Sequence, residues 1–271
     1  MERIAGVIGS PVGHSLSPAI HNAAFRASGI EAHYAAFEVA PGQAPAALQA
    51  VRTLGLLGLS VTTPHKEDVA DHVDELSAAA AALHSVNTVV VGRGGTLVGY
   101  STDGDGFVAS LAAAGVDVAG AVVAVVGAGA AARSIVGALA RAGATEIAVV
   151  NRSEDRAEAA AALAAVARVG IADDIGRAAV VVNATSVGMG TDDSPVDPDR
   201  LRPGQVVADL VYHPLDTALL RAAATRGCRT VDGLGMLVHQ AVLQQVLWTG
   251  SAPDPALLRA AAEAELARRG P

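Results

Sequence analysis

Short apolar runs rich in valine, isoleucine and leucine alternate along the chain with longer segments in which apolar residues recur at helical spacing. In the first 114 residues this pattern predicts strands at 3–8, 34–39, 58–61, 86–91 and 97–101. It predicts helices at 18–28, 67–83 and 105–114, and a further helix that runs through Leu48. Its beginning is therefore a βαβαβ series. We expect Ser17 and Thr63 to be N-caps, because each precedes a proline suited to the first helical position, and Gly29 to end the first helix.

A second α/β series begins at Ala121. Its expected strands cover 122–126, 147–150, 180–183, 206–210 and 229–231, and two helices follow at 235–248 and 255–269. We predict an α/β protein of two domains, with the first at 1–104, a Rossmann-type second at 105–234, and C-terminal helices at 235–271 that return to the first.

Composition narrows the class of protein. The 271 residues can bury a sizeable core, and the 51% hydrophobic share comes mostly from alanine and valine, which suits helices packed closely on a parallel sheet. A net charge of −8 and 3% aromatic residues argue against a nucleic-acid partner. No apolar stretch is long enough for a membrane span, the start at Met1 lacks a signal-peptide layout, Cys228 is the only cysteine and the histidines are scattered. We expect a cytoplasmic protein, monomeric or homodimeric, without disulfides, membrane contact or metal.

The turn after the strand at 122–126 has the composition of a dinucleotide site. Gly127 allows a tight turn, Gly129 lets backbone approach a pyrophosphate, and Ala132 keeps the next helix close to the sheet. Phosphate would lie at the N-terminus of that helix. Such turns also occur for packing reasons, so the flanking valine strand and the alanine-rich helix carry the prediction.

At the end of the next strand, where NAD-binding folds place an acidic residue, the chain has Asn151, Arg152, Ser153 and Arg156. Two cations there favour a 2′-phosphate and hence NADP. The alternative is an exposed helix start with Ser153 as N-cap. That alternative explains the serine well and the arginines poorly, because cations oppose the helix dipole at this end.

Four polar loops of the first domain hold further candidate chemistry. We expect each to lie where a strand ends, because the C-terminal ends of the strands form the ligand crevice of parallel α/β sheets. Hydroxyls, an amide, an ammonium and a carboxylate could converge there, a set that suits a small polyol acid. The loops cover 13–18, 60–66, 85–88 and 99–104.

Lys66 is expected in the first turn of a helix, where its ammonium opposes the dipole and gives up its proton more easily. Held charged by Asp103, it could give that proton to a carbonyl oxygen as hydride arrives. The alternatives are a surface lysine and an Asx turn before Gly104.

The other candidates also have structural explanations. Ser17 and Thr63 can be helix caps, Asn87 a turn former and Tyr212 a half-buried packing residue. A structural explanation is weaker for Ser15 and Thr62, and His65 is expected to be structural.

Taken together, these loops resemble the shikimate dehydrogenase family over nearly the whole chain and in the family's order. The matching segments are Ser15-Leu16-Ser17-Pro18, 61–66, Val86-Asn87-Thr88, Thr102-Asp103-Gly104, the turn at Gly127, 151–156, 183–186, 209–212 and 233–240.

The resemblance implies reversible NADPH-dependent reduction of 3-dehydroshikimate to shikimate, in an N-terminal substrate domain and a Rossmann-type NADP-binding domain that meet at a cleft. It implies that Lys66 and Asp103 are the catalytic pair. Residues implied to hold the substrate are Ser15, Ser17, Thr62, Lys66, Asn87, Asp103, Tyr212 and Gln240. Residues implied to hold NADP are Gly127, Ala128, Gly129, Ala130, Ala131, Asn151, Arg152, Ser153, Arg156, Leu210 and Gly233.

The chain departs from the family pattern at three positions. Ser60 and Ser101 stand where many relatives have asparagine, and Ser153 where they have threonine. Loss of an amide beside Thr62 affects the expected substrate affinity more than the reaction type. Alternatives are a quinate/shikimate dehydrogenase that prefers NAD, a folate-linked dehydrogenase of similar build, and a dinucleotide-sensing relative without catalysis.

Overall fold

The computed structural model describes residues 3–270, which form two compact units. Met1 and Glu2 lie outside the described residues; they begin the segment that was expected to lack a signal-peptide layout. Unit 1 comprises the chain up to Thr102 and from Val238 onward, and unit 2 covers Asp103–Leu237. Helix α9 (Leu234–Thr249) begins in unit 2 and ends in unit 1. Among the described residues, no helix is long and apolar enough to cross a bilayer, and no three potential ligands gather as a metal site.

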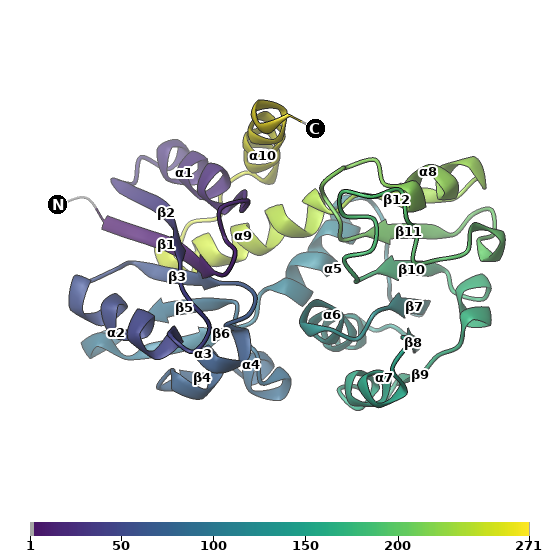
Figure 1. Cartoon of the computed structure of the whole chain (residues 1–271), viewed down its shortest axis with the longest axis horizontal. Helices are drawn as coiled ribbons and strands as arrows, with labels where there is room; N and C mark the ends of the chain where they lie inside the picture. Colours follow the sequence, from purple (N-terminus) through teal and green to yellow (C-terminus); the bar gives the residue numbers. More distant parts are fainter. Residues whose placement is uncertain (1–2, 271) are drawn as a thin grey trace. The chain divides into compact units, whose positions relative to one another are not determined.

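Unit 1 is built on a six-stranded sheet in the order β2-β1-β3-β5-β6-β4 (Figure 1). Its strands are β1 (Arg3–Gly9), β2 (Ala32–Glu38), β3 (Gly58–Val61), β4 (Glu75–Leu76), β5 (Thr88–Val91) and β6 (Leu97–Tyr100). Its helices, besides part of α9, are α1 (Ser17–Ala27), α2 (Ala44–Leu54), α3 (Lys66–His72), α4 (Ala78–Leu83), the 3₁₀ turn η1 (Arg93–Gly95) and α10 (Pro255–Arg269).

The core of unit 1 lies on both faces of this sheet. On one face, Leu59 and Val61 of β3 pack with Leu48 of α2 and Val69 of α3. On the other face, residues of β1 and β2 pack with α1 and with the single tryptophan, Trp248 of α9. Burial on both faces explains why β1 and β3 are nearly continuous apolar runs.

The sheet of unit 1 is mixed, whereas the sequence alone predicted the βαβαβ part and did not fix the direction of the later strands. Strands β2, β1 and β3 are parallel, but β5 is antiparallel to both β3 and β6. A short connection through η1 joins β5 to β6, and such a connection can only return the chain antiparallel.

The helix predicted at 67–83 is wrong as a single element. It ends at His72, and the chain forms strand β4 before α4 begins. The cause is tertiary, because the Asp74 carboxylate accepts hydrogen bonds from Arg52 at 2.9 Å and from the Leu97 amide at 2.6 Å. Pairing with β6 outweighs the helix propensity of the segment.

Unit 2 has six parallel strands in the order β12-β11-β10-β7-β8-β9 (Figure 1). The strands are β7 (Val122–Val126), β8 (Glu146–Val150), β9 (Ala167–Val169), β10 (Val180–Asn183), β11 (Val206–Asp209) and β12 (Arg229–Val231). The helices are α5 (Asp103–Ala113), α6 (Ala130–Arg141), α7 (Glu154–Ala161), η2 (Ala172–Gly176), η3 (Pro198–Arg200) and α8 (Ala218–Thr225).

Strand β7 shows how the valine runs of unit 2 are used. Val123 and Val125 pack with α5, α6 and α7, whereas Ala124 and Val126 pack with α8. A strand covered by helices on both faces has no polar side, as the sequence predicted. The Rossmann-type α/β fold is confirmed, whereas the short strand β9, helix α8 and the 3₁₀ turns η2 and η3 were not among the predicted elements.

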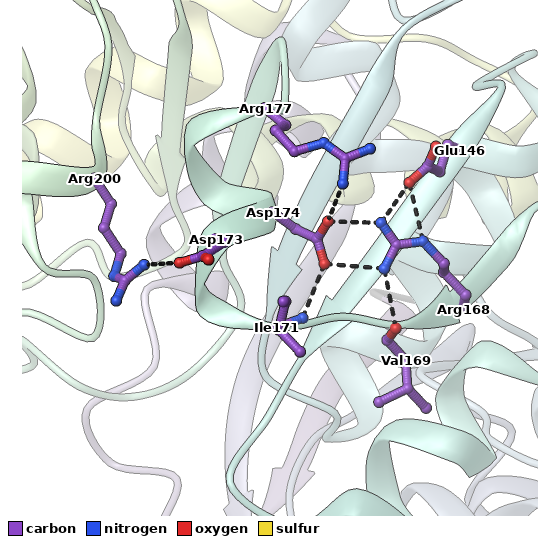
Figure 2. Close-up of polar contacts among 8 residues, drawn as sticks. All are labelled: Glu146, Arg168, Val169, Ile171, Asp173, Asp174, Arg177 and Arg200. Carbon is purple, nitrogen blue, oxygen red and sulfur yellow. Dashed lines mark hydrogen bonds and ion pairs between the residues drawn. The ribbon is translucent and has the colours of Figure 1, made fainter.

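The edge strand β9 is held by a cluster of ion pairs (Figure 2). The guanidinium of Arg168 donates to Asp174 at 2.6 and 2.9 Å and to Glu146 at 2.5 and 3.0 Å. Arg177 lies 3.3 Å from the same buried carboxylate, and the adjacent, exposed Asp173 pairs with Arg200. The Arg168 bonds hold the pKa of Asp174 at about 2. This cluster joins β8, β9, η2 and η3 and is a structural feature of unit 2.

Candidate active site

The four polar loops of the first domain lie at one edge of the unit 1 sheet. Strands β1, β3 and β6 each end at this edge, and β5 begins there because it is antiparallel to its neighbours. Ser60 pairs with Thr88, and Thr88 pairs with Tyr100. Asn87 therefore precedes a strand instead of ending one, but it still joins the same group of loops.

Two predicted helix caps are wrong. The N-cap of α1 is Leu16, and Ser17 is already the first helical residue. The N-cap of α3 is His65, and the Thr63–Pro64 peptide before it is cis. The side chain of Ser17, which is buried, instead hydrogen-bonds Tyr34, and the Ser17 amide donates to Ser15 Oγ at 3.2 Å. Ser17 therefore has a structural contact with Tyr34 in place of the expected capping role.

Lys66 is the first residue of α3 and is half-buried. Its carbonyl accepts from the Val86 amide at 2.9 Å, which ties the start of α3 to the loop before Asn87. The neighbouring His65 is 1% exposed and bonds the Val39 carbonyl at 2.7 Å, in keeping with the structural role expected for it.

A signal at Lys66 was missed in the sequence. It is the only lysine of the chain, and the other 18 basic residues among the 19 are arginines. An arginine remains protonated at any physiological pH, whereas a lysine can give up its proton. The one position with an ammonium is thus the one where proton transfer was expected.

Asn87 is 3% exposed and its amide is firmly held. Its Oδ1 accepts from the Thr102 amide and from the Thr88 hydroxyl, both at 2.8 Å, and its Nδ2 donates to Thr102 Oγ1 at 2.9 Å. Asp103 follows Thr102 directly. It is the first residue of α5, whereas the structural alternative had placed it in an Asx turn. Asp103 belongs to unit 2 and Lys66 to unit 1, so their pairing stays a prediction.

The structure adds four buried polar residues of α1, β2 and α9 that the sequence analysis did not single out. His21, Tyr34, Gln244 and Gln245 are buried and hydrogen-bonded around Ser60. Gln240, which is 6% exposed, lies one helical turn before Gln244 on α9. The sequence signal was a pair of adjacent glutamines in a mainly apolar helix that also carries the predicted Gln240.

In unit 2 the glycine turn is built as the sequence predicted. Gly127 has φ +113°, and a Cβ there would lie 2.9 Å from Thr185 Cγ2 and 3.0 Å from the Ala184 carbonyl oxygen. Gly129 is the N-cap of α6, with no heavy atom within 4 Å of its would-be Cβ, and Ala132 is fully buried. Chain order reverses at β7, which lies between β8 and β10, and ligands of open α/β sheets bind at such switch points.

The basic segment after β8 is exposed at its arginines. Ser153 is the N-cap of α7 and accepts from the Arg156 amide, while Asn151 Nδ2 donates to the Ser153 carbonyl at 2.9 Å. Within residues 3–270, neither Arg152 nor Arg156 has a carboxylate partner for its guanidinium. Their charge is therefore open to an external anion.

The loop after β10 is organised by a buried amide. Asn183 donates to Asp209 Oδ1 at 2.8 Å and accepts from the Thr185 amide and hydroxyl. Burial raises the pKa of Asp209, which also accepts from the Thr217 hydroxyl and the Val211 amide. These bonds fix the segments next to Gly127 and before Tyr212, which is half-buried.

Leu210 and Gly233 are in direct contact in unit 2. A Cβ on Gly233 would lie 2.4 Å from the Leu210 carbonyl oxygen, so only glycine fits there. The structure thus groups the predicted cofactor residues within unit 2, and the predicted substrate residues other than Asp103 and Tyr212 within unit 1.

Comparison with known proteins agrees with this arrangement. Family models match for the shikimate dehydrogenase substrate binding domain at residues 7–89, for shikimate / quinate 5-dehydrogenase at 110–187, and for the shikimate 5′-dehydrogenase C-terminal domain at 233–263. The chain is 45% identical to the shikimate dehydrogenase (NADP(+)) of Symbiobacterium thermophilum, across 97% of this chain and 95% of that protein.

Solved structures are similar over the same extent. Shikimate 5-dehydrogenase from Thermus thermophilus, in complex with NADP(H) and shikimate, has a TM-score of 0.93 and 38% identity, covering 98% of this chain and 100% of that one. Quinate dehydrogenase from Corynebacterium glutamicum, in complex with NAD, has a TM-score of 0.90 and 32% identity, covering 98% and 99%. The same fold therefore occurs with both cofactors, so the fold alone does not determine which one is bound.

Proposed function

This chain belongs to the shikimate dehydrogenase family, and we propose that Lys66 and Asp103 are the pair with which it performs the NADPH-dependent reduction of 3-dehydroshikimate to shikimate. The observation that carries the assignment of Lys66 is its place as the only lysine, at the start of α3 among the four polar loops. A small polyol acid suits the serine and threonine hydroxyls and the buried amides at this edge.

The reaction needs a proton where Lys66 can deliver one. When bound, the reduced nicotinamide supplies a hydride to the carbonyl carbon. The Lys66 ammonium gives its proton to the carbonyl oxygen, which becomes the new hydroxyl, and solvent then reprotonates the amine. Asp103 keeps Lys66 charged before the transfer. Contacts to the substrate are assigned to Ser15, Ser17, Thr62, Asn87, Tyr212 and Gln240.

Cofactor binding is assigned to unit 2. Residues 127–131 would hold the pyrophosphate at the N-terminus of α6, because the open space at Gly129 admits a phosphate against the backbone. Arg152 and Arg156 would hold the 2′-phosphate, with Asn151 and Ser153 shaping the loop between them. Leu210 and Gly233 lie against each other beside the same sheet.

The test follows NADPH absorbance when 3-dehydroshikimate is added at neutral pH, with NADH in parallel. We expect NADPH to be oxidised in strong preference to NADH. Oxidation with NADH alone would refute the role of Arg152 and Arg156 and support the quinate/shikimate alternative. Silence with both cofactors would support a sensing relative that has lost catalysis.

Lys66 is tested with two variants. Lys66→Ala and Lys66→Arg should both reduce kcat by roughly a hundredfold or more, because Arg keeps the charge but cannot give up its proton. Amine-selective acylation offers a second test, since Lys66 is the only side chain that reacts. Shikimate with NADP should protect against inactivation, and full activity of the acylated enzyme would remove Lys66 from the mechanism.

A further inference from the structure

A chain of buried hydrogen bonds leads from α1 and β2 through α9 to Asn87. Its members come from five elements and the loop before β5, and each is at most 6% exposed. They are His21, Tyr34, Ser60, Asn87, Thr88, Gln244 and Gln245. Because buried polar groups are hydrogen-bonded and each atom has a fixed set of donors and acceptors, the direction of each bond can be derived.

The assignment of donors and acceptors begins with the side chain of Gln244. Its Oε1 has two contacts, with Ser60 Oγ at 2.9 Å and with His21 Nε2 at 3.0 Å, so both of these groups must donate to it. The hydrogen of the Ser60 hydroxyl is thereby used, and the Tyr34 hydroxyl donates to Ser60 Oγ at 2.6 Å. Burial raises the pKa of Tyr34 far above its usual range, which keeps that hydroxyl protonated.

His21 then has one possible tautomer. Its Nε2 carries the hydrogen that goes to Gln244, so its Nδ1 accepts from the Gln245 amide at 2.9 Å. The imidazole stacks on Tyr34 with ring centres 4.3 Å apart. Burial lowers the pKa of His21 to about 3, so the ring is neutral at physiological pH.

The NH₂ group of the Gln244 side chain determines the orientation of the Asn87 amide. Gln244 Nε2 donates to Thr88 Oγ1 at 2.9 Å, and the Thr88 hydroxyl donates in turn to Asn87 Oδ1 at 2.8 Å. The Thr102 amide donates to the same Oδ1. Both lone pairs of Oδ1 are occupied, so Asn87 can meet a substrate only through its Nδ2 donor.

We propose that Gln244 and Thr88 are positioning residues that hold the Asn87 amide as a hydrogen-bond donor toward an oxygen of the polyol acid. This inference rests on the proposed function, since it takes Asn87 as a substrate contact. Neither Gln244 nor Thr88 needs to touch the substrate. Ser60 fits this arrangement, because its hydroxyl donates to the carboxamide that Gln244 brings from α9.

The first test removes one hydroxyl at constant volume. Thr88→Val deletes the donor to Asn87 Oδ1, and Thr88→Ser keeps it as the matched control. We expect Thr88→Val to raise KM for 3-dehydroshikimate about tenfold, with kcat within about threefold and the Kd for NADPH unchanged, because only substrate alignment is lost. Thr88→Ser should remain close to the wild type.

The second test moves the side-chain carboxamide from position 244 on α9 to position 60 on β3. Gln244→Ala should raise KM in the same manner, and the double variant Gln244→Ala/Ser60→Asn should recover most of the loss by restoring a carboxamide from β3. Thermal unfolding followed by Trp248 fluorescence checks that each variant is folded, since Trp248 lies in the same unit.

Each outcome decides the matter. Equal KM for Thr88→Val and Thr88→Ser in an active enzyme would overturn the positioning role and leave the proposed function intact. A parallel loss of kcat, NADPH affinity and thermal stability in Thr88→Val would also overturn it, because that pattern is loss of structure. A wild type that oxidises no NADPH with 3-dehydroshikimate would overturn the proposed function itself.

Discussion

Buried His21 should make the stability of unit 1 depend on pH between about 3 and 6.5. Its pKa is about 3 in the folded chain, against an ordinary value of 6.5. The unfolded chain therefore binds more protons between these values, and the free energy of unfolding rises with pH. The contribution is fully present above about pH 6.5 and is lost progressively as the pH falls toward about 3.

The size of the effect follows from the two pKa values. A difference of about 3.5 at ~1.4 kcal/mol per pKa unit corresponds to about 5 kcal/mol when the loss is complete. Between pH 7.5 and pH 5 the expected loss is about 2 kcal/mol. Glu38 and Asp74 of the same unit have lowered pKa values, so their stabilising effect is lost only below about pH 4.5.

Urea unfolding measures this directly, because Trp248, the only tryptophan, packs 5.2 Å from the His21 ring. The urea midpoint should fall by about 1 M between pH 7.5 and pH 5. His21→Asn should be less stable at neutral pH but lose this dependence. His33→Asn, at an exposed histidine of the same unit, should retain it. An unchanged slope in His21→Asn would refute the assignment to His21.

Three further results are expected. Asp174→Asn should lower the free energy of unfolding of unit 2 by about 2 kcal/mol in calorimetry, because a buried carboxylate bound to Arg168 loses its charge. The matched change at its exposed neighbour (Figure 2), Asp173→Asn, should lower it by less than about 1 kcal/mol, and equal losses would contradict the role of burial. Gly127→Ala should destabilise unit 2 by roughly 1–3 kcal/mol through its positive φ and close neighbours, and an unchanged melting temperature would be inconsistent with this geometry. Gly129→Ala should leave the melting temperature unchanged but weaken NADPH binding about tenfold or more by fluorescence titration, and normal affinity would place the pyrophosphate elsewhere.

Much of unit 2 follows from local sequence. The valine strands, the glycine turn and the alanine-rich helix α6 were all predictable, because a strand buried on both faces must be apolar throughout and a tight approach of backbone to Thr185 admits only glycine. The position of Lys66 at a helix start was likewise predictable, because it depends on residues within one turn.

Unit 1 shows where local patterns fail. Ser17 is a residue type that favours the N-cap position, but it lies inside α1, because its hydroxyl bonds Tyr34 of strand β2. The segment after His72 has helix-forming residues, yet Asp74 and its partner Arg52 draw it into the sheet. In both cases a contact with a distant residue outweighs a local preference worth about 1 kcal/mol.

The sequence by itself determined the fold class, the two α/β series and the types of chemical group available at the strand ends, because these depend on periodicity and on neighbours along the chain. Only the tertiary structure decided which of those groups meet. Ser60, Thr88 and Gln244 are far apart in sequence, and no periodic pattern links them. Their hydrogen bonds exist because β3, β5 and α9 pack together and bury these side chains, and buried polar groups need hydrogen-bond partners.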